Sequence, residues 1–263
     1  MNPLLPALLL TILLAACAPE PAPRWGDRST ATVSHNICAP YDRSLLDGMD
    51  PQAQVTWLTE RMKTCRAACE AAGTCNDDDT AAMAIDFYNR ANAQGELGRH
   101  GEAVADYSRS LALDPTFVPA YAQRAMELIA MDRFTEALAD ADAAIARAPN
   151  DPRPHGLRCL VLLELKQHKE ALAACATATG LAPGVPALQM IHGMALARDG
   201  QEEAALTQME QAIAADPTVV SVLQEQMRKA GYHAGPASGS YDQATQDALA
   251  KWIAAGAPGE GST

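Results

Sequence analysis

Four prolines fall in one register along this chain. Pro115, Pro149, Pro183 and Pro217 are spaced 34 residues apart. A fixed period between about 20 and 50 residues indicates a repeat architecture, in which each unit buries its apolar face against its neighbours. This period therefore limits the fold to a solenoid more strongly than any other feature of the sequence.

Small residues recur in the same register. Twelve residues before each proline the sequence has an alanine: Ala103, Ala137, Ala171 and Ala205. Twenty-four residues before each proline it has another small residue: Ala91, Ala125, Cys159 and Gly193. Two antiparallel helices approach closely only where the side chains between them are short. Each proline lacks an amide hydrogen and cannot continue a helix, so it marks the turn into the next helical hairpin.

This set of positions resembles the tetratricopeptide repeat (TPR) family over residues 84–217. The family's aromatic position near the start of each hairpin is missing in the last two repeats, which have His155 and Gln189 there. The resemblance implies an all-α fold. We predict an α-solenoid of about four TPR helical hairpins, with an N-terminal disulfide-stapled helical unit at 38–83 and a small C-terminal helical element at 218–254.

Composition and charge narrow the class of partner. Apolar residues make up 48% of the chain but aromatic residues only 5%, so the core must be built from Ala, Leu and Met, which suits close helix packing. The net charge is −12 and no basic cluster occurs. Nucleic acid is therefore not an expected partner, because phosphate binding needs a concentrated Lys/Arg face.

The N-terminus reads as an export signal. The apolar run Leu4 to Leu14 is too short to span a bilayer, which takes about 20 residues. It ends in Leu14-Ala15-Ala16-Cys17, which resembles the lipobox of bacterial lipoproteins. That resemblance implies cleavage of residues 1–16, acylation of Cys17 with chains such as palmitate, and, since Ala18 is not Asp, transfer to the periplasmic face of the outer membrane. Residues 17–37 then form a lipidated tether. An ordinary secretory signal is the alternative.

Six further cysteines lie beyond Cys17: Cys38, Cys65, Cys69, Cys75, Cys159 and Cys175. An even number in an exported chain favours disulfides. Asp50-Pro51 opens a predicted helix that Gly73 ends, and Cys65 and Cys69 lie one turn apart on it, so each should pair outward, one with Cys38 and the other with Cys75.

Metal binding is the alternative for these cysteines. The spacings do not match two CxxC zinc knuckles, and we predict no metal site. Cys159 and Cys175 face each other across the third hairpin, where a disulfide and two free buried thiols both remain open. A Cys2His2 site with His155 and His192 is a weaker alternative.

The first helices of the hairpins should form a concave surface, which solenoids use to bind extended peptides. Candidates for this peptide groove are Tyr88, Asn92, Gln123, Met126, Arg153, Leu157, Met190 and Met194. Some TPR proteins grip a terminal carboxylate here; only Asn92 and Arg153 match that pattern. An apolar, methionine-lined contact with a protein or peptide is therefore favoured.

The C-terminal segment carries a second resemblance. After Leu223-Gln224 the sequence continues through Gly231-Tyr232, Gly235, Gly239, Tyr241, Thr245, Ala248-Leu249 and Trp252. The order and spacing resemble the small helical peptidoglycan-binding domain of envelope proteins. The resemblance implies Tyr232, Gly235, Gly239, Tyr241 and Thr245 as peptidoglycan candidates, and a packing remnant is the alternative. Residues 255–263 are predicted to be a disordered tail.

No nucleophile–base pair, metal-ligand spacing or phosphate loop stands out, so we predict no catalytic residue and no cofactor. The expected function is a non-catalytic periplasmic outer-membrane lipoprotein that acts as a TPR interaction scaffold in the cell envelope, in contact with the wall. The alternative is a structural tether that links the outer membrane to peptidoglycan through the C-terminal element.

Overall fold

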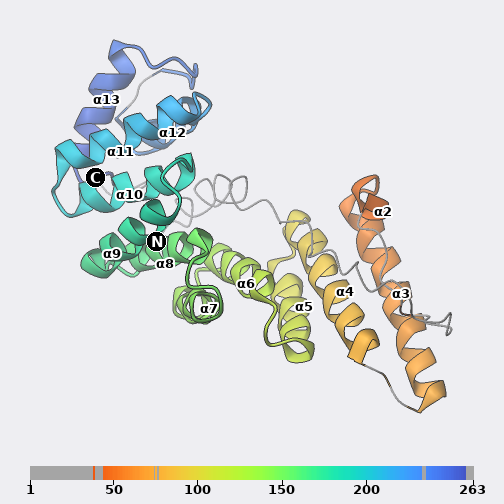
Figure 1. Cartoon of the computed structure of the whole chain (residues 1–263). Helices are drawn as coiled ribbons and strands as arrows, with labels where there is room; N and C mark the ends of the chain where they lie inside the picture. The colour runs from red at the N-terminus through yellow and green to blue at the C-terminus, as the bar shows by residue number, and fades with distance from the viewer. Residues whose placement is uncertain (1–37, 39–43, 74, 76, 233–234, 259–263) are drawn as a thin grey trace. The chain divides into compact units, whose positions relative to one another are not determined.

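The computed structural model describes residues 38, 44–73, 75, 77–232 and 235–258. Within them the chain is all-helical, without a strand (Figure 1). The helices are α2 (Ser44–Asp47), α3 (Pro51–Ala72), α4 (Asp77–Glu96), α5 (His100–Leu113), α6 (Val118–Ala130), α7 (Phe134–Arg147), α8 (Pro152–Glu164), α9 (His168–Leu181), α10 (Pro186–Arg198), α11 (Glu202–Ala215), α12 (Val219–Lys229) and α13 (Gln243–Ala254). The predicted signal peptide, Cys17 and the tether lie outside these residues.

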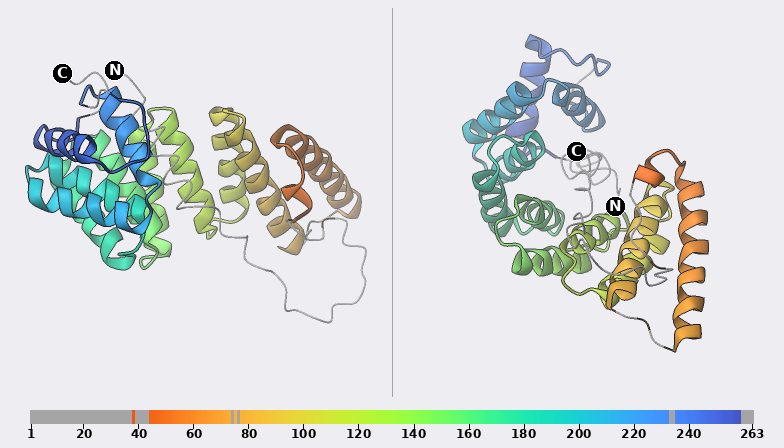
Figure 2. Two further views of the ribbon diagram at one scale, coloured as in Figure 1. Left: turned by 90° about the horizontal axis from the view of Figure 1, so that it is seen from above. Right: turned by 45° about the vertical axis from the view of Figure 1, so that its right-hand side comes forward.

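The described residues divide into two compact units, one up to Met131 and the other from Asp132 onward. The first contains α2 to α6, and α3, α4 and α5 lie side by side in both views of Figure 2. The second contains α7 to α13, with α8 paired to α9 and α10 paired to α11. Among the described helices, none combines the length and apolar character needed to cross a membrane.

The repeat register predicted from the prolines is confirmed. Each of the four prolines lies in the short turn between the second helix of one hairpin and the first helix of the next. The eight small residues of the register are buried, with Ala91, Ala103, Ala125, Ala137, Cys159, Ala171 and Ala205 all at 0% exposure. Gly193 takes the position where the side chain of Met209 needs room, since an added Cβ would lie 2.8 Å from Met209 Cγ.

The turn inside each hairpin also repeats. Gly98, Asp132, Lys166 and Gly200 share one register position and all have positive φ, at 71°, 57°, 59° and 78°. Left-handed backbone is unstrained only for glycine. Asp132 and Lys166 therefore carry a conformational cost that the hairpin packing must offset.

The N-terminal unit begins as its sequence predicts. Asp50 caps α3 by accepting a hydrogen bond from the Ala53 amide at 2.9 Å, Pro51 is the first helical residue, and Gly73 ends the helix with φ 76°. α4 starts at Asp77, and three aspartates in its first turn complement the positive end of the helix dipole.

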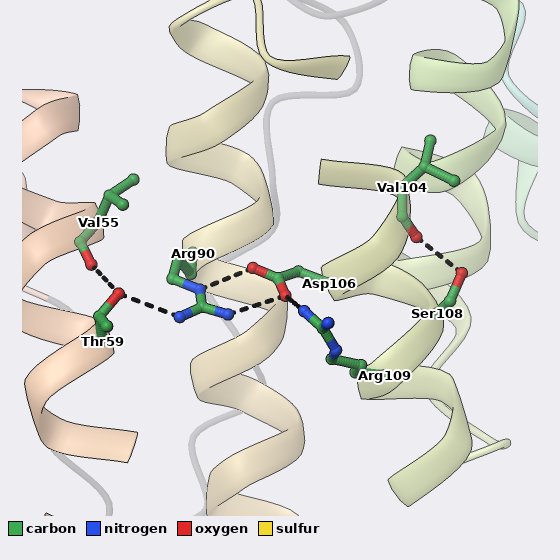
Figure 3. Close-up of polar contacts among 7 residues, drawn as sticks. All are labelled: Val55, Thr59, Arg90, Val104, Asp106, Ser108 and Arg109. Carbon is green, nitrogen blue, oxygen red and sulfur yellow. Dashed lines mark hydrogen bonds and ion pairs between the residues drawn. The ribbon is translucent and has the colours of Figure 1, made fainter. Parts of the chain in front are cut away.

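Buried ion pairs hold α3, α4 and α5 together. Figure 3 shows Asp106, which is 1% exposed and accepts from Arg90 Nε at 2.7 Å, from Arg90 Nη2 at 2.9 Å and from Arg109 Nη1 at 2.6 Å. Arg90 Nη1 also donates to Thr59 Oγ1 on α3 at 3.0 Å. The packing of α3, α4 and α5 therefore depends on buried charged side chains as well as on small side chains.

A second buried carboxylate joins α3 to α4. Arg61 Nε donates to both oxygens of Asp86 at 3.1 and 3.0 Å, while Arg61 Nη2 donates to the Cys38 carbonyl at 3.2 Å. Burial raises the pKa of Asp86 to about 6, although the Arg61 guanidinium acts in the opposite direction.

Candidate functional site

A short loop between α12 and α13 forms the centre of the C-terminal element. Gly231 ends α12 with φ 83°, and the Tyr232 amide returns to the Met227 carbonyl at 2.7 Å. Residues 236–240 are exposed, and Gly239 has φ 74°. The segment 236–240 is therefore exposed to solvent, and Gly231 and Tyr232 fix the start of the loop on α12.

One buried glutamine holds the loop in place. Gln224 is 1% exposed. Its Nε2 donates to Ser240 O at 3.0 Å, to Thr245 Oγ1 at 2.9 Å and to Ser238 Oγ at 3.2 Å. Its Oε1 accepts from the Gly239 amide at 2.9 Å. A single side chain on α12 thus holds residues 238–240 of the exposed segment and the start of α13.

Thr245 is part of this support. It is 2% exposed, and both its amide and its hydroxyl donate to Asp242 Oδ1 at 2.9 Å, which caps α13. Thr245 is one of the five predicted peptidoglycan residues, but it is buried, and its role in the structure is to hold the loop and the start of α13 in position. Gly239 is exposed, and Tyr232, Gly235 and Tyr241 are partly exposed on the same loop.

Tyr241 connects the loop to α11. Its hydroxyl donates to Glu210 Oε1 at 3.2 Å. Burial and the neighbouring Glu210 carboxylate raise the pKa of Tyr241 to about 12, so the phenol stays protonated and keeps this bond at neutral pH. The loop is thereby linked to the second helix of the fourth repeat.

α13 closes the element by packing against α10, α11 and α12. Leu249 and Trp252 are buried at 0% and 1%. The indole of Trp252 donates to the Pro258 carbonyl at 2.9 Å, and the buried Ala257 donates its amide to the Trp252 carbonyl at 2.8 Å. Residues 255–258 were predicted to belong to the disordered tail. They are instead folded, because they hydrogen-bond to the indole and to the backbone carbonyl of Trp252.

Most of the predicted groove residues are buried within the helix stack. Tyr88, Met126, Leu157, Met190 and Met194 are all at most 2% exposed, and Gln123 is 8% exposed. Asn92 and Arg153 are partly exposed. Of the predicted groove residues, Asn92 in the first unit and Arg153 in the second therefore keep some exposure, while the methionines do not.

Asn92 has unused hydrogen-bonding capacity. Its Oδ1 accepts from the hydroxyl of Tyr107 at 2.6 Å, which fixes the orientation of the amide. Its Nδ2 is buried and has no hydrogen-bond partner among the described residues. Tyr107 is itself buried, which raises its phenol pKa well above the ordinary value and keeps it a donor.

An apolar pocket opens in the first unit, between α4 and the turn into α6. Its volume is about 280 Å³. The lining residues are Ala81, Ala84, Ile85, Asp114, Thr116, Phe117, Val118 and Pro119. The pocket has no signal in the sequence, because it combines one face of α4 with a turn about 30 residues away in the chain.

The six cysteines form three disulfides. Cys38 pairs with Cys65 and Cys69 with Cys75, with Cα–Cα distances of 5.2 and 4.9 Å, which confirms the outward pairing of the two α3 cysteines. Cys159 and Cys175 also pair, at 5.2 Å, which resolves the choice left open by their spacing. The sulfurs are thus bonded to each other, an arrangement that does not favour the zinc alternative.

The polar pairs between neighbouring helices were not predicted from the sequence. A signal existed, because Arg90, Arg124 and Arg158 share one register position, and each donates to a side chain on a second helix: Asp106, Ser108 and Asp142. Reading charged residues in the same 34-residue register would have found them.

Two family models match the chain. Residues 84–117 match "Tetratricopeptide repeat", and residues 206–256 match "Putative peptidoglycan binding domain". The second match begins inside α11, so this helix belongs both to the last hairpin and to the C-terminal element. TPR domains are typically non-catalytic, and neither matched family is a catalytic domain.

Solved structures show the same fold. MamA from Desulfovibrio magneticus RS-1, residues 41 to its end, superposes with a TM-score of 0.50 at 19% identity and covers 68% of this chain and 97% of its own. A double mutant of the RS-1 protein gives 0.51 at 19%, covering 68% and 97%. Another MamA structure gives 0.50 at 16%, covering 60% and 88%. Among curated proteins, none matches this sequence.

These similarities support the fold alone, while the two family matches identify its parts. The helices of the structure, the 34-residue register of the sequence and the two matched segments agree with one another. The chain is a TPR-repeat protein whose C-terminal segment, residues 206–256, matches the family "Putative peptidoglycan binding domain".

Proposed function

We propose that this protein is a non-catalytic scaffold of the cell envelope, which binds a protein or peptide through its repeats and peptidoglycan through its C-terminal element. The observation that carries the proposal is the peptidoglycan-binding match at 206–256, which shares α11 with the last repeat. A wall-binding module built onto a helix of the stack suits a protein that holds its partner close to the wall.

The proposed wall-binding surface is the exposed loop after α12. Tyr232 and Tyr241 offer aromatic faces, and the segment 236–240 offers backbone donors and acceptors that a glycan or stem peptide can use. Gln224 and Thr245 act behind this surface by holding the loop in one conformation. A loop that is ordered before binding loses less entropy on binding.

The proposed protein-binding positions lie on first helices of the repeats, with Asn92 in the first unit and Arg153 in the second. Asn92 supports this role, because the residue is partly exposed and its amide is held in one orientation by the Tyr107 hydroxyl. Arg153 adds a cation, partly neutralised by Asp151 at 2.8 Å.

Disulfides and a wall-binding segment are consistent with an extracytoplasmic, envelope location. Within that setting we propose a lipid anchor at Cys17 on the periplasmic face of the outer membrane. Metabolic labelling with a palmitate analogue tests the anchor: we expect label on the wild-type chain and none on Cys17→Ser. Label that persists on Cys17→Ser would contradict it.

The alternative is a structural tether between outer membrane and peptidoglycan, in which the repeats serve as a spacer. The two functions differ in their need for the repeat surface. Site-specific crosslinking in cells should recover a protein partner with the wild type and lose it with Asn92→Ala/Arg153→Ala, while binding to the wall persists. Equal recovery of all crosslinks from that variant would favour the tether.

A further inference from the structure

Four cysteines of the first unit form one compact sulfur cluster. The Sγ atoms of Cys38, Cys65 and Cys69 all lie within 4.8 Å of one another. Two of them already form one disulfide, and the third belongs to the neighbouring disulfide with Cys75. Cys65 and Cys69 are four residues apart on α3, so one helical turn separates the two bonds.

The two disulfides differ in access. Cys38, Cys65 and Cys69 are 2%, 1% and 7% exposed, whereas Cys75 is exposed just outside the end of α3. An external thiolate can therefore attack Cys75 directly, but it meets the other three sulfurs only behind packed side chains, among them Ala82 and Met83 of α4. Disulfide exchange depends on which sulfur can be reached.

We propose that these four cysteines form a thiol–disulfide exchange site, entered at Cys75 by an external dithiol, in which Cys65 and Cys69 are alternative partners of Cys38. The co-reactant is a dithiol of the kind that thiol–disulfide oxidoreductases carry. No metal or further cofactor takes part.

The steps balance without another oxidant or reductant. The external thiolate attacks Cys75 Sγ, forms a mixed disulfide and expels the Cys69 thiolate. The second thiol of the reagent, as its thiolate, then attacks its own sulfur in that mixed disulfide, releases the Cys75 thiolate and leaves the reagent oxidised by two electrons. The Cys69 thiolate attacks Cys38 Sγ, forms a Cys38–Cys69 bond and expels the Cys65 thiolate. Released thiolates take up protons from water.

This exchange changes the structure around Cys38. Moving its bond from Cys65 to Cys69 shifts the attachment point by about 6 Å along α3. The Cys38 carbonyl now accepts from Arg61 Nη2 at 3.2 Å, and Arg61 in turn pairs with buried Asp86. A shift of one turn would break the Arg61–Cys38 contact, so the pairing state of the cysteines would alter the junction between α3 and α4.

The test on the wild-type chain uses one equivalent of dithiothreitol, an acid quench, alkylation with N-ethylmaleimide and peptide mapping. We expect alkylated Cys75 together with alkylated Cys65, and a Cys38–Cys69 linked peptide. Label confined to Cys75 and Cys69 would overturn the proposal. Label on Cys38 and Cys65 in equal amounts would also overturn it, because it would mean direct reduction of the inner bond.

Two variants isolate the internal step. Cys75→Ser leaves Cys69 as a thiol beside the Cys38–Cys65 bond, and we expect both Cys38–Cys65 and Cys38–Cys69 peptides from it. Cys65→Ser/Cys75→Ser leaves only Cys38 and Cys69 in this cluster, and we expect them to pair on oxidation. A variant with native circular dichroism but no Cys38–Cys69 bond would refute the exchange geometry.

Discussion

Replacing Gln224 with methionine should loosen the loop that we propose binds the wall. Gln224→Met keeps the size of the buried side chain but removes its hydrogen bonds. The amide has two donors and accepts from the Gly239 amide, so three bonds are lost, which at about 1 kcal/mol each amounts to about 3 kcal/mol. Water can replace part of this in an exposed loop, so we expect a loss of about 2 kcal/mol.

Gln226 supplies a matched control on the same helix. It is 5% exposed, but its Nε2 has no hydrogen-bond partner among the described residues. Gln226→Met therefore removes an unsatisfied donor and should leave stability unchanged or raise it by about 1 kcal/mol. The comparison separates lost hydrogen bonds from the general effect of a Gln→Met change in a buried site.

Amide hydrogen exchange resolves the effect at the loop. In Gln224→Met we expect the Gly239 amide to exchange about 30-fold faster, which corresponds to about 2 kcal/mol, and urea unfolding followed by tryptophan fluorescence in a Trp25→Phe/Trp57→Phe background to shift to lower denaturant. Gln226→Met should leave the Gly239 rate unchanged. Equal rates in both variants and the wild type would refute the assignment of Gln224 as the residue that holds the loop.

Three further predictions concern the repeat stack. Lys166→Gly should raise the free energy of unfolding by about 1 kcal/mol, measured by urea titration, because Lys166 has φ 59° and glycine removes that strain; a decrease would contradict this. Gly193→Ala should lower the thermal midpoint by an amount equivalent to about 1–3 kcal/mol, since its Cβ would meet Met209 Cγ at 2.8 Å, and an unchanged midpoint would show that the hairpin has spare room. Asp86 has a pKa of about 6 in the folded chain against 3.8 in the reference state, so the folded chain holds a proton that the unfolded chain has released between those values. Its contribution to stability should fall as pH rises through that window, by on the order of 2 kcal/mol, and Asp86→Asn should remove this slope in unfolding curves measured across it.

The periodic part of the fold was predictable because it depends on residue size at fixed spacing. Ala91 and Ala103 are small for the same reason as their counterparts in later repeats, so the 34-residue register reports helix contacts directly. The cysteine pairing on α3 was predictable because Cys65 and Cys69 lie one turn apart on the same helix face, which favours a bond from each to a cysteine outside the helix.

The groove was harder to predict because the first helices of the last two repeats, α8 and α10, pack against neighbours on both sides. α10 illustrates this, since residues on all its faces are buried, from Ala187 to Ala197. A helix that is apolar all round belongs to the interior, so its methionines were a core signal and not evidence of an open surface. The polar support of the loop was hidden for another reason: Gln224 and Thr245 are 21 residues apart and meet only after α13 has folded back.

The central claim, that the C-terminal element binds the wall, is tested most directly by co-sedimentation with purified peptidoglycan sacculi. The samples are the mature chain without lipid, the variant Tyr232→Ala/Tyr241→Ala, and Tyr121→Ala as a control for loss of a partly exposed tyrosine in the repeats. We predict that the wild type and Tyr121→Ala pellet with sacculi and that the double variant, with an unchanged circular dichroism spectrum, stays in the supernatant. Failure of the folded wild-type chain to pellet would contradict the account.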